Sequence, residues 1–552
     1  MKNLLIPSSS IELLILPSLL LLVLSSHAIN ADQYKKLDEN SYRQCLCNHS
    51  VPSHLYFTPQ SPSYNYFFFS SVRNRRPLLN SFKPLVIFLP AVENHVQAAV
   101  LCSRSLSIPI RTRSGGHDYE GLSYTSTSGQ FVLIDLQFLS SINVDYKNSR
   151  TAWVQVGATL GQLYHAIANQ SSTAAFPAGL CPTVGVGGHV SGGGFGMMSR
   201  YFGLASDNVE DIRIVVASGE IVDRQSMGED LFWALRGGGG ASFGIILAYK
   251  VRLVEVPNKV TVFTVSKTLE EGATKLVDEW QRIAHKVDKR LFIRTLFKVV
   301  GNDSDEHDDQ NKTTNRTVQI SFNSLFLGEM KELLLIMEDC FPELQLKAED
   351  CIEMRWIDSV LYFAGKGYQG KPLSSLVERY SPVYNSSFKH KSDFFTKAIP
   401  SEGWNRILRR FLEKGEQPMM IIDPWGGRMD EISETETAFP HRKGNLYNVH
   451  YLTQRWVEDD VAVSMKHVDW LRRFYKFMTP YVSKNPRAAY LNYRDLDIGM
   501  DVMGNKTSYW EARRWGERYY KGNFKRLAYV KGEVDPNNMF RNEQSIPPLF
   551  SS

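Results

Sequence analysis

Apolar residues follow two different rhythms between residues 85 and 255. Short runs typical of buried β-strands alternate with longer segments in which apolar residues recur every three or four positions, as on one face of a helix. This alternation predicts an α+β or α/β domain. The strand-like runs are LVIFLP (85–90), QFVLIDL (130–136), AWVQVGA (152–158), IRIVVAS (212–218) and GIILAYKVRLV (244–254), and the helical segments are ENHVQAAVLCSRS (93–105) and TLGQLYHAIANQ (159–170).

The pattern changes after Pro257, where we place a domain boundary. Longer helical segments, EEGATKLVDEWQRIAHKV (270–287) and MKELLLIMEDC (330–340), then mix with strands such as TVQISFNSLFLG (317–328). The polar stretch at residues 301–317 is expected to be a solvated loop; the alternative, a calcium site, lacks the twelve-residue EF-hand pattern.

The first 28 residues have the pattern of a signal peptide. Lys2 precedes an apolar core at residues 11–24, and Ser26-His27-Ala28 resembles a cleavage site with small residues. This core is shorter than the roughly 20 residues that span a bilayer, so an uncleaved anchor is the weaker alternative. We therefore expect a secretory-pathway protein, extracellular (apoplastic) or vacuolar, without stable membrane insertion. Seven sequons for N-glycans fit this route: Asn48, Asn169, Asn302, Asn311, Asn315, Asn385 and Asn505.

Composition narrows the classes of function. The 552 residues are 43% hydrophobic and 22% charged, as in an ordinary globular protein. A formal net charge of only +5, without a run of lysine or arginine, makes a nucleic-acid partner a poor hypothesis. The six cysteines are too few for a disulfide-dense scaffold, and their spacing alone assigns no pairs.

Two glycine clusters, VGVGGHVSGGGFG (184–196) and RGGGGASFG (236–244), carry the first chemical signal. Glycine lets the backbone approach a ligand closely, and successive amides can bind an anion such as phosphate. Neither cluster has the lysine of a Walker loop or the strand-to-helix context of a Rossmann fingerprint. The chain also lacks H-E-x-x-H, zinc-like cysteine pairs and the G-x-S-x-G elbow, so no metal site is predicted.

Five motifs together resemble the plant berberine bridge enzyme-like family, FAD-linked oxidases of the vanillyl-alcohol oxidase superfamily with a PCMH-type FAD-binding domain. The resemblance runs in order from about Cys45 to the C-terminus. The motifs are RTRSGGHDYEGLSY (111–124), AGLCPTVGVGGHVSGGGFG (178–196), FWALRGGGGASFGIILAYKVRLV (232–254), AYLNYRDLDIG (489–499) and MFRNEQSIPP (539–548).

This resemblance implies an α+β fold with an FAD-binding domain and a substrate domain built on an antiparallel sheet. The boundaries are 1–28 for the signal peptide, 29–79 for an N-terminal segment, 80–256 for the FAD domain, 257–488 for the substrate domain, and 489–552 for a segment that returns to the FAD domain. The family holds FAD by two covalent bonds, which map to His117 and Cys181. The other residues expected at the cofactor are Arg111, Arg113, Ser114, Gly115, Gly116, Gly179, Val184, Gly187, Gly188, His189, Gly192, Gly193 and Gly194.

The resemblance also suggests catalytic residues. Tyr493 is the expected base, with Tyr119 and Tyr490 in the same region, provided that a positive charge lowers the tyrosine pKa from about 10. Arg494 is adjacent, but neighbouring residues on a strand point to opposite faces. Val184 and Gly179 match the oxygen-facing positions of oxidases. His450 stands where relatives carry glutamine or glutamate, as a base, a hydrogen-bond donor or a wall of the pocket. Arg294 either binds a phenolate or other acidic substrate group or forms a salt bridge at the surface.

Relatives carry a disulfide whose cysteines map to Cys45 and Cys102. Cys181 is then committed to flavin, Cys340 and Cys351 are candidates to pair with each other, and Cys47 is left over.

The leading hypothesis is therefore an oxidase of a specialised plant metabolite, such as a phenolic, an alkaloid or a terpenoid-phenol, with O2 as acceptor and with or without oxidative cyclisation. The alternatives are a carbohydrate oxidase, a non-redox cyclase of the Diels-Alder type on the same FAD scaffold, and a cofactor-free binding protein.

Overall fold

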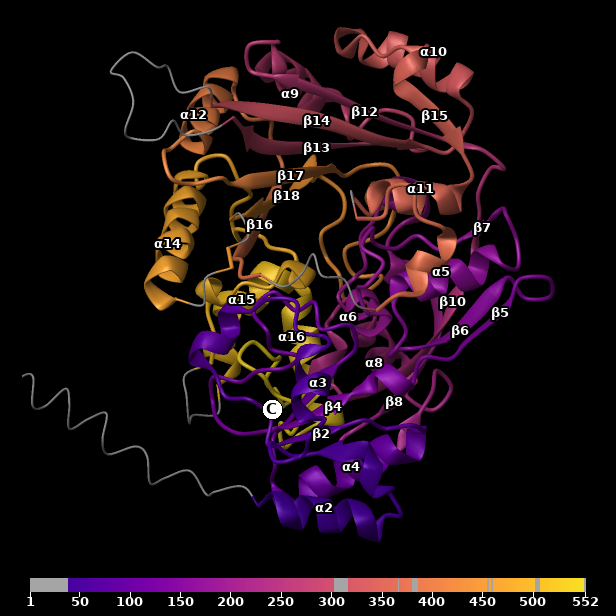
Figure 1. The fold of residues 1–552 in the computed structure, drawn as a ribbon, viewed down its shortest axis with the longest axis vertical. Coiled ribbons are helices and arrows are strands. Elements are labelled where there is room, and N and C mark those ends of the chain that lie inside the picture. The colour runs from indigo at the N-terminus through magenta and orange to yellow at the C-terminus, as the bar shows by residue number, and fades with distance from the viewer. Residues whose placement is uncertain are drawn as a thin grey trace, which may run out of the picture.

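The computed structural model describes residues 38–301, 316–365, 367–379, 386–453, 456–457, 460–501 and 507–550. Within these ranges, helices pack around two mainly antiparallel sheets and two smaller ones (Figure 1). The α+β class expected from the sequence is confirmed. The signal peptide and the sequons at Asn302, Asn311, Asn315, Asn385 and Asn505 lie outside the described residues.

The first half of the chain forms three of these sheets. The four-stranded sheet has the order β1-β2-β4-β3, with parallel β2, β4 and β3, and the five-stranded sheet, β5-β6-β10-β8-β9, is antiparallel throughout. Every residue of β2 and β4 is buried, which explains the apolar sequence VIF of β2 and VLI of β4; the buried Asp135 that ends β4 pairs with Arg113. The strands are β1 (Tyr56–Phe57), β2 (Val86–Phe88), β3 (Ile110–Arg113), β4 (Val132–Asp135), β5 (Ile142–Asp145), β6 (Thr151–Gln155), β7 (Ala174–Ala175), β8 (Val209–Val215), β9 (Ile221–Val222), β10 (Ile245–Arg252) and β11 (Val254–Glu255), the last of which pairs with β7.

Local sequence explains where several helices begin. The hydroxyl of Thr159 accepts a hydrogen bond from the amide of Gln162, whose side chain accepts one from the amide of Thr159, so both orphan donors at the start of α5 are satisfied. The helices of this half are α2 (Glu39–Asn48), α3 (Tyr64–Phe69), α4 (Glu93–Leu106), α5 (Leu160–Ala168), α6 (Val186–Ser191), α7 (Ser199–Phe202) and α8 (Gly228–Leu235).

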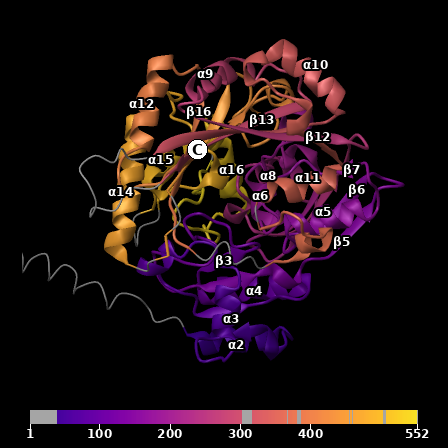
Figure 2. The same ribbon diagram turned by 45° about the horizontal axis from the view of Figure 1, so that its top comes forward.

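A seven-stranded antiparallel sheet dominates the second half, in the order β15-β12-β14-β13-β17-β18-β16. Helices α9, α10, α12 and α14 cover one face of it and share its apolar core, as Figures 1 and 2 show. The opposite face packs partly against the core of the first half of the chain, and its strands β13, β17, β18 and β16 also border a cavity. The elements are β12 (Val260–Thr268), α9 (Ala273–Ile283), β13 (Leu291–Val300), β14 (Thr317–Phe326), α10 (Met330–Cys340), β15 (Cys351–Met354), α11 (Trp356–Phe363), β16 (His390–Phe395), α12 (Ser401–Phe411), β17 (Met419–Pro424), α13 (Arg428–Glu431), β18 (Tyr447–Leu452) and α14 (Val461–Phe477).

The C-terminal segment packs back onto the first half of the chain. It contains the short 3-10 helices η10 (Leu491–Tyr493) and η11 (Leu496–Ile498), followed by α15 (Tyr509–Tyr520) and α16 (Asn523–Val534), drawn in yellow in Figure 1. The ammonium group of Lys531 donates to the carbonyl of Ser242 at 2.6 Å, next to the second glycine cluster. The chain therefore closes the first domain with its last residues.

The elements predicted from periodicity correspond to β2, β4, β6, β8, β10, α4, α5, α9, α10 and β14. Two local expectations were wrong. The IRTR run was not identified as a strand, although it forms β3, and residues 491–493 form a 3-10 turn rather than a strand. Because η10 turns, strand alternation does not decide where Tyr493 and Arg494 point.

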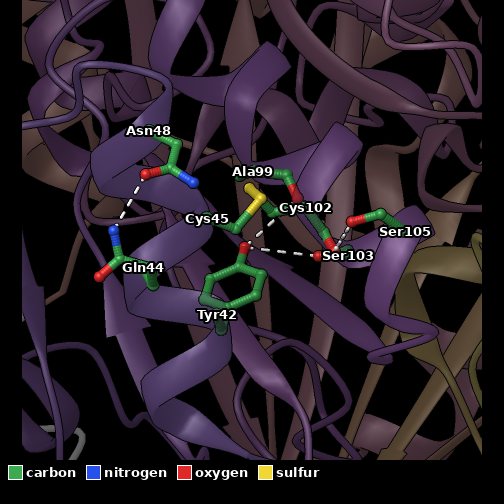
Figure 3. Close-up of a disulfide and its surroundings, with 8 residues drawn as sticks. All are labelled: Tyr42, Gln44, Cys45, Asn48, Ala99, Cys102, Ser103 and Ser105. Carbon is green, nitrogen blue, oxygen red and sulfur yellow. Dashed lines mark hydrogen bonds between the residues drawn. A yellow bond between two sulfur atoms is a disulfide. The ribbon is translucent and has the colours of Figure 1, made fainter.

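One disulfide links Cys45 of α2 to Cys102 of α4, as the resemblance implied (Figure 3). The candidate pair of Cys340 and Cys351 is wrong, because both thiols are free. Cys340 is the last residue of α10, whereas Cys351 opens β15 and is held in register with Phe263 of β12. Cys47 is free and exposed.

Two of the predicted glycan acceptors lie in the described part of the chain. Asn48 and Asn169 are both exposed at helix ends, which is compatible with a surface glycan. Among the described helices, none has the length and apolarity needed to cross a bilayer.

Candidate active site

A cavity of about 520 Å³ lies between the glycine clusters, the face of the seven-stranded sheet away from its covering helices, and the C-terminal segment. Most residues predicted for the site line it, although they come from positions 111 to 493. These are Arg111, Ser114, Gly115, Gly116, His117, Tyr119, Gly179, Cys181, Val184, Gly187, Gly188, His189, Arg294, His450, Tyr490 and Tyr493.

The turn that precedes His117 requires glycine for a reason that the sequence did not reveal. A Cβ on Gly116 would lie 1.8 Å from the carbonyl oxygen of Ser71, and its φ of +71° is unfavourable for other residues. A Cβ on Gly115 would lie 2.2 Å from the amide nitrogen of Gly185. The close approach observed here is therefore between backbone segments of the protein, and it fixes the direction in which His117 leaves the turn.

His117 and Cys181 meet at one threonine. Nε2 of His117 lies 2.9 Å from Oγ1 of Thr183, and Sγ of Cys181 lies 3.5 Å from the same oxygen. An imidazole and a thiol are both nucleophiles, so this wall of the cavity carries two groups able to bond to one electrophilic ligand. Thr183 was not identified from the sequence, although it belongs to the same C-P-T motif.

The first glycine cluster contributes both to the cavity and to its support. A Cβ on Gly188 would have no protein atom within 4 Å, so a ligand can lie directly against this backbone. Nε2 of His189 accepts a hydrogen bond of 2.9 Å from the amide of Gly179, and burial lowers the pKa of His189 to about 4, so its imidazole is neutral. A Cβ on Gly179 would lie 2.7 Å from the same ring, which requires glycine at this position.

Gly192, Gly193 and Gly194 do not line the cavity, contrary to the expectation from the sequence. A Cβ on these residues would meet Asn492, Phe439 and Ala205, respectively, at 2.0 to 3.0 Å. The three glycines are needed for packing of the C-terminal segment and neighbouring loops against the cluster.

The two arginines of β3 point to different places. Arg113 does not line the cavity; it is fully buried, pairs with Asp135 at 2.6 Å and donates to two backbone carbonyls of α3. Alternation along a strand explains the separation. Arg111 lines the cavity and pairs with Glu543 at 2.9 Å, and its buried Nε has no hydrogen-bond partner among the described residues. That unpartnered donor fits an acceptor on a bound cofactor.

Four rings enclose the end of the cavity beneath the sheet. Tyr493 stacks on His450 with a centroid distance of 3.8 Å and an interplanar angle of 7°. The ring of Tyr119 is nearly parallel to both and lies 5.5 Å from His450 and 5.8 Å from Tyr493. The fourth ring, His390, lies 4.0 Å from Tyr119. We call this group of Tyr119, His390, His450 and Tyr493 the aromatic chamber.

His390 was not predicted from the sequence. It belongs to β16, and Nδ1 of His390 lies 2.5 Å from Nε2 of His450 on the neighbouring β18. The lysine on each side of His390 is the signal that would have identified this histidine. Successive side chains of a strand point to opposite faces, so the two lysines share one face and His390 lies on the other.

Those lysines form a buried ionic network behind the chamber. Lys389 contacts Glu120 and lies 2.8 Å from Asp495, and Lys391 lies 2.7 Å from Asp495. Although burial raises it, Arg76 and Lys389 lower the pKa of Glu120 to about 2. Each of three chamber rings is close in sequence to a member of this network. Tyr119 precedes Glu120, His390 lies between the two lysines, and Tyr493 lies two residues before Asp495. The network therefore holds the backbone that carries these rings.

The electrostatics do not favour Tyr493 as an ionised base. Burial, together with Asp423 and Tyr119, raises the pKa of Tyr493 well above its usual value, and Arg294 only partly opposes this. Arg494, the expected source of positive charge, pairs instead with Asp118 at 3.2 Å. Tyr493 therefore keeps its proton at neutral pH.

Arg294 lines the cavity but already has a carboxylate partner. Its Nε and Nη2 donate to the two oxygens of Asp423, at 2.5 and 3.0 Å, and Asp423 is completely buried. Of the two alternatives left by the sequence, the salt bridge is observed, and it is buried rather than at the surface.

Tyr490 connects the C-terminal segment to the first glycine cluster. Its hydroxyl accepts hydrogen bonds from the amides of Gly194 and Phe195 at 3.1 and 3.2 Å and from the side chain of Asn492 at 2.9 Å. Burial raises the pKa of Tyr490 to about 12. This tyrosine positions the wall of the cavity and remains neutral.

Comparison with known proteins agrees with this geometry. Residues 84–224 match the family model for an FAD binding domain, and residues 489–547 match the model for berberine and berberine-like proteins. The chain is 49% identical over 470 residues to Berberine bridge enzyme-like 22 of Arabidopsis thaliana, covering 85% of this chain and 86% of the relative. It is 49% identical over 516 residues to the tetrahydroberberine oxidase of Berberis wilsoniae, covering 92% and 94%. The solved structure of Phl p 4, a grass pollen allergen with glucose dehydrogenase activity, has a TM-score of 0.85 and 42% identity, covering 92% of this chain and all of the allergen chain.

Proposed function

Because the chain belongs to the berberine bridge enzyme-like family of FAD-linked oxidoreductases, we propose that it oxidises a small aromatic plant metabolite, such as a phenolic, an alkaloid or a terpenoid-phenol, and transfers the electrons to O2 with release of H2O2. The observation that carries this proposal is one cavity that joins the His117, Thr183 and Cys181 group to the aromatic chamber. A redox cofactor held at the first would face a substrate held in the second.

FAD attachment through both His117 and Cys181 is part of the proposal. Both residues line the cavity and share Thr183, whose hydroxyl keeps an imidazole nitrogen and a sulfur on the same wall. Gly188 offers open space for close contact with the cofactor, and Arg111 offers an unpartnered donor. Bound FAD would supply the acceptor for a hydride from the substrate.

The chamber favours an aromatic substrate over a sugar. Apart from its four rings, it is bordered by apolar side chains from β17, from β18 and from the loop before β16, among them Phe388, Met419, Ile421 and Leu452. A sugar would bury several hydroxyl groups and needs a partner for each. The glucose dehydrogenase activity of the similar allergen is therefore the weaker model for this chain.

We assign the substrate proton to His450 in preference to Tyr493. Burial and the charge of Arg294 lower the pKa of His450 to about 3, so this imidazole is neutral; in the tautomer whose Nε2–H donates to His390, its Nδ1 is bare and can take the proton. Tyr493, in contrast, keeps its proton and serves as a stacking wall. As a hydride leaves the substrate carbon, its hydroxyl becomes strongly acidic, so a weak base suffices.

Reaction with oxygen and cellular location complete the proposal. Gly179 and Val184, the positions that the resemblance associates with approach of O2, both line the cavity near Cys181. The signal-peptide pattern, the disulfide and two exposed sequons support a secretory route to the apoplast or vacuole, with N-glycans on the surface.

The test is anaerobic mixing of purified, yellow protein with phenolic alcohols, tetrahydroisoquinoline-type alkaloids and glucose, followed by admission of air. We expect flavin bleaching with an aromatic compound, then recovery with one H2O2 released per product. Product formation without bleaching or H2O2 would instead identify a non-redox cyclase, and bleaching by glucose alone a carbohydrate oxidase.

A further inference from the structure

His390 and His450 form a pair that spans two adjacent strands. In the register of β16 with β18, His450 faces Ser392, and His390 lies two positions further along. This diagonal placement allows side chains on one face to meet. Both rings line the cavity, with only 7% and 4% of their surface exposed.

The hydrogen bond between them decides what His450 offers to a ligand. Nδ1 of His390 and Nε2 of His450 are 2.5 Å apart, so one of the two carries the shared proton. If His390 donates, His450 must hold its own proton on Nδ1; if His450 donates, its Nδ1 is bare. Nδ1 of His450 forms no hydrogen bond within the described part of the chain. Which side of this hydrogen bond carries the proton therefore fixes the tautomer of His450.

Among the described residues, the charged groups around this nitrogen are each paired with an opposite charge. From β13, Arg294 pairs with Asp423 of β17, and its positive charge still helps to lower the pKa of His450. The phenol ring of Tyr493 stacks directly on the imidazole, and the nearly parallel ring of Tyr119 lies beside both of them. Lys389 and Lys391, on the far face of β16, are tied to carboxylates. Burial lowers the pKa of His450 and raises the pKa of Tyr493, so both groups are uncharged at neutral pH.

We propose that Nδ1 of His450, in the tautomer fixed by the hydrogen bond with His390, binds one hydroxyl group of an uncharged aromatic substrate, and that the chamber rejects the corresponding ammonium and carboxylate compounds. A hydroxyl group donates and accepts, so it satisfies this nitrogen in either tautomer. An ion would lose its hydration without a counter-charge. This inference rests on the proposed function for the identity of the chamber as the substrate site, and it narrows that function to neutral, hydroxylated substrates.

The test compares four ligands with one skeleton: 3-phenylpropan-1-ol, propylbenzene, 3-phenylpropylamine and 3-phenylpropanoate. Dissociation constants are measured by calorimetry on the full-length, flavin-containing protein without oxygen, so no turnover is needed. We expect the alcohol to bind about three- to tenfold more tightly than the hydrocarbon, the range of one net hydrogen bond. The amine and the acid should bind at least about tenfold more weakly than the alcohol.

Variants separate recognition from a structural role. His450→Leu should abolish the preference for the alcohol over the hydrocarbon, and His390→Leu should reduce this preference. His390→Asn keeps an amide near the position of Nδ1, so it should retain more of the preference than His390→Leu. The matched control is His467→Gln, because His467 forms its hydrogen bond with Glu416 outside the cavity. This variant should prefer the alcohol over the hydrocarbon as strongly as the wild type does.

Two results would overturn the proposal: equal affinity of the wild type for the alcohol and either ion, or an undiminished preference for the alcohol in His450→Leu. Failure of the proposed function is a separate result, since an absence of flavin reduction by every aromatic compound would leave this binding series unchanged.

Discussion

Gly188 provides a direct test of where the cofactor lies. It is in α6 and lines the cavity, and an added Cβ would meet no protein atom within 4 Å. Its φ is not positive, so alanine fits the backbone. Gly188→Ala therefore changes the cavity without disturbing the packing of the protein.

The expected effects on folding and on FAD binding have opposite signs. Alanine is favoured over glycine within a helix by about 1 kcal/mol, so the flavin-free protein should be as stable as its parent or slightly more stable. A methyl group forced against a bound ring system costs about 1–3 kcal/mol. This corresponds to roughly five- to 150-fold weaker FAD binding.

The assay uses the His117→Ala, Cys181→Ala background, so that FAD can be removed and titrated back. Quenching of flavin fluorescence gives the dissociation constant, and thermal unfolding of the flavin-free protein gives stability. Gly522→Ala is the matched control, because a Cβ there also meets no atom but lies at the exposed start of α16. If Gly188→Ala bound FAD as tightly as its parent, the cofactor would not lie against α6.

Four further predictions concern the tether, the ionic network and the C-terminal segment. His117→Ala and Cys181→Ala should each leave one bond to flavin. Acid precipitation should then give a yellow pellet from both single variants and a yellow supernatant only from the double variant. A colourless pellet from the wild type would refute the covalent attachment. The lowered pKa of Glu120 means that its contribution to stability is complete above about pH 4.5 and is lost as the pH falls towards 2, which melting curves against pH will measure. Lys389→Met should remove about 3–5 kcal/mol at neutral pH by leaving buried carboxylates unpaired, and unchanged denaturant unfolding would contradict this. Tyr490→Phe removes the acceptor of three donors and should cost about 1–3 kcal/mol in the same assay, with a loss near zero arguing against its positioning role.

Local features of the sequence predicted much of this protein. Apolar periodicity located β2, β4, β6, β8, β10, α4 and α5 because burial on one or both faces dictates it. The order of five motifs indicated the family, which the comparisons confirm. The same motifs pointed to His117 and Cys181, and the structure places both in the lining of one cavity. The expected disulfide is also present. Each of these depends on residues close together in the chain or on a motif read in order.

Partners across the sheet were decided only by the tertiary structure. The sheet order β17-β18-β16 brings His390 beside His450, and the pairing of β13 with β17 brings Arg294 to Asp423, across 60 and 129 residues. Periodicity specifies which face a side chain occupies but not which strand becomes its neighbour. The sequence by itself therefore determined the kinds of groups in the site, whereas strand order and register determined which charges cancel and which imidazole nitrogen faces the substrate.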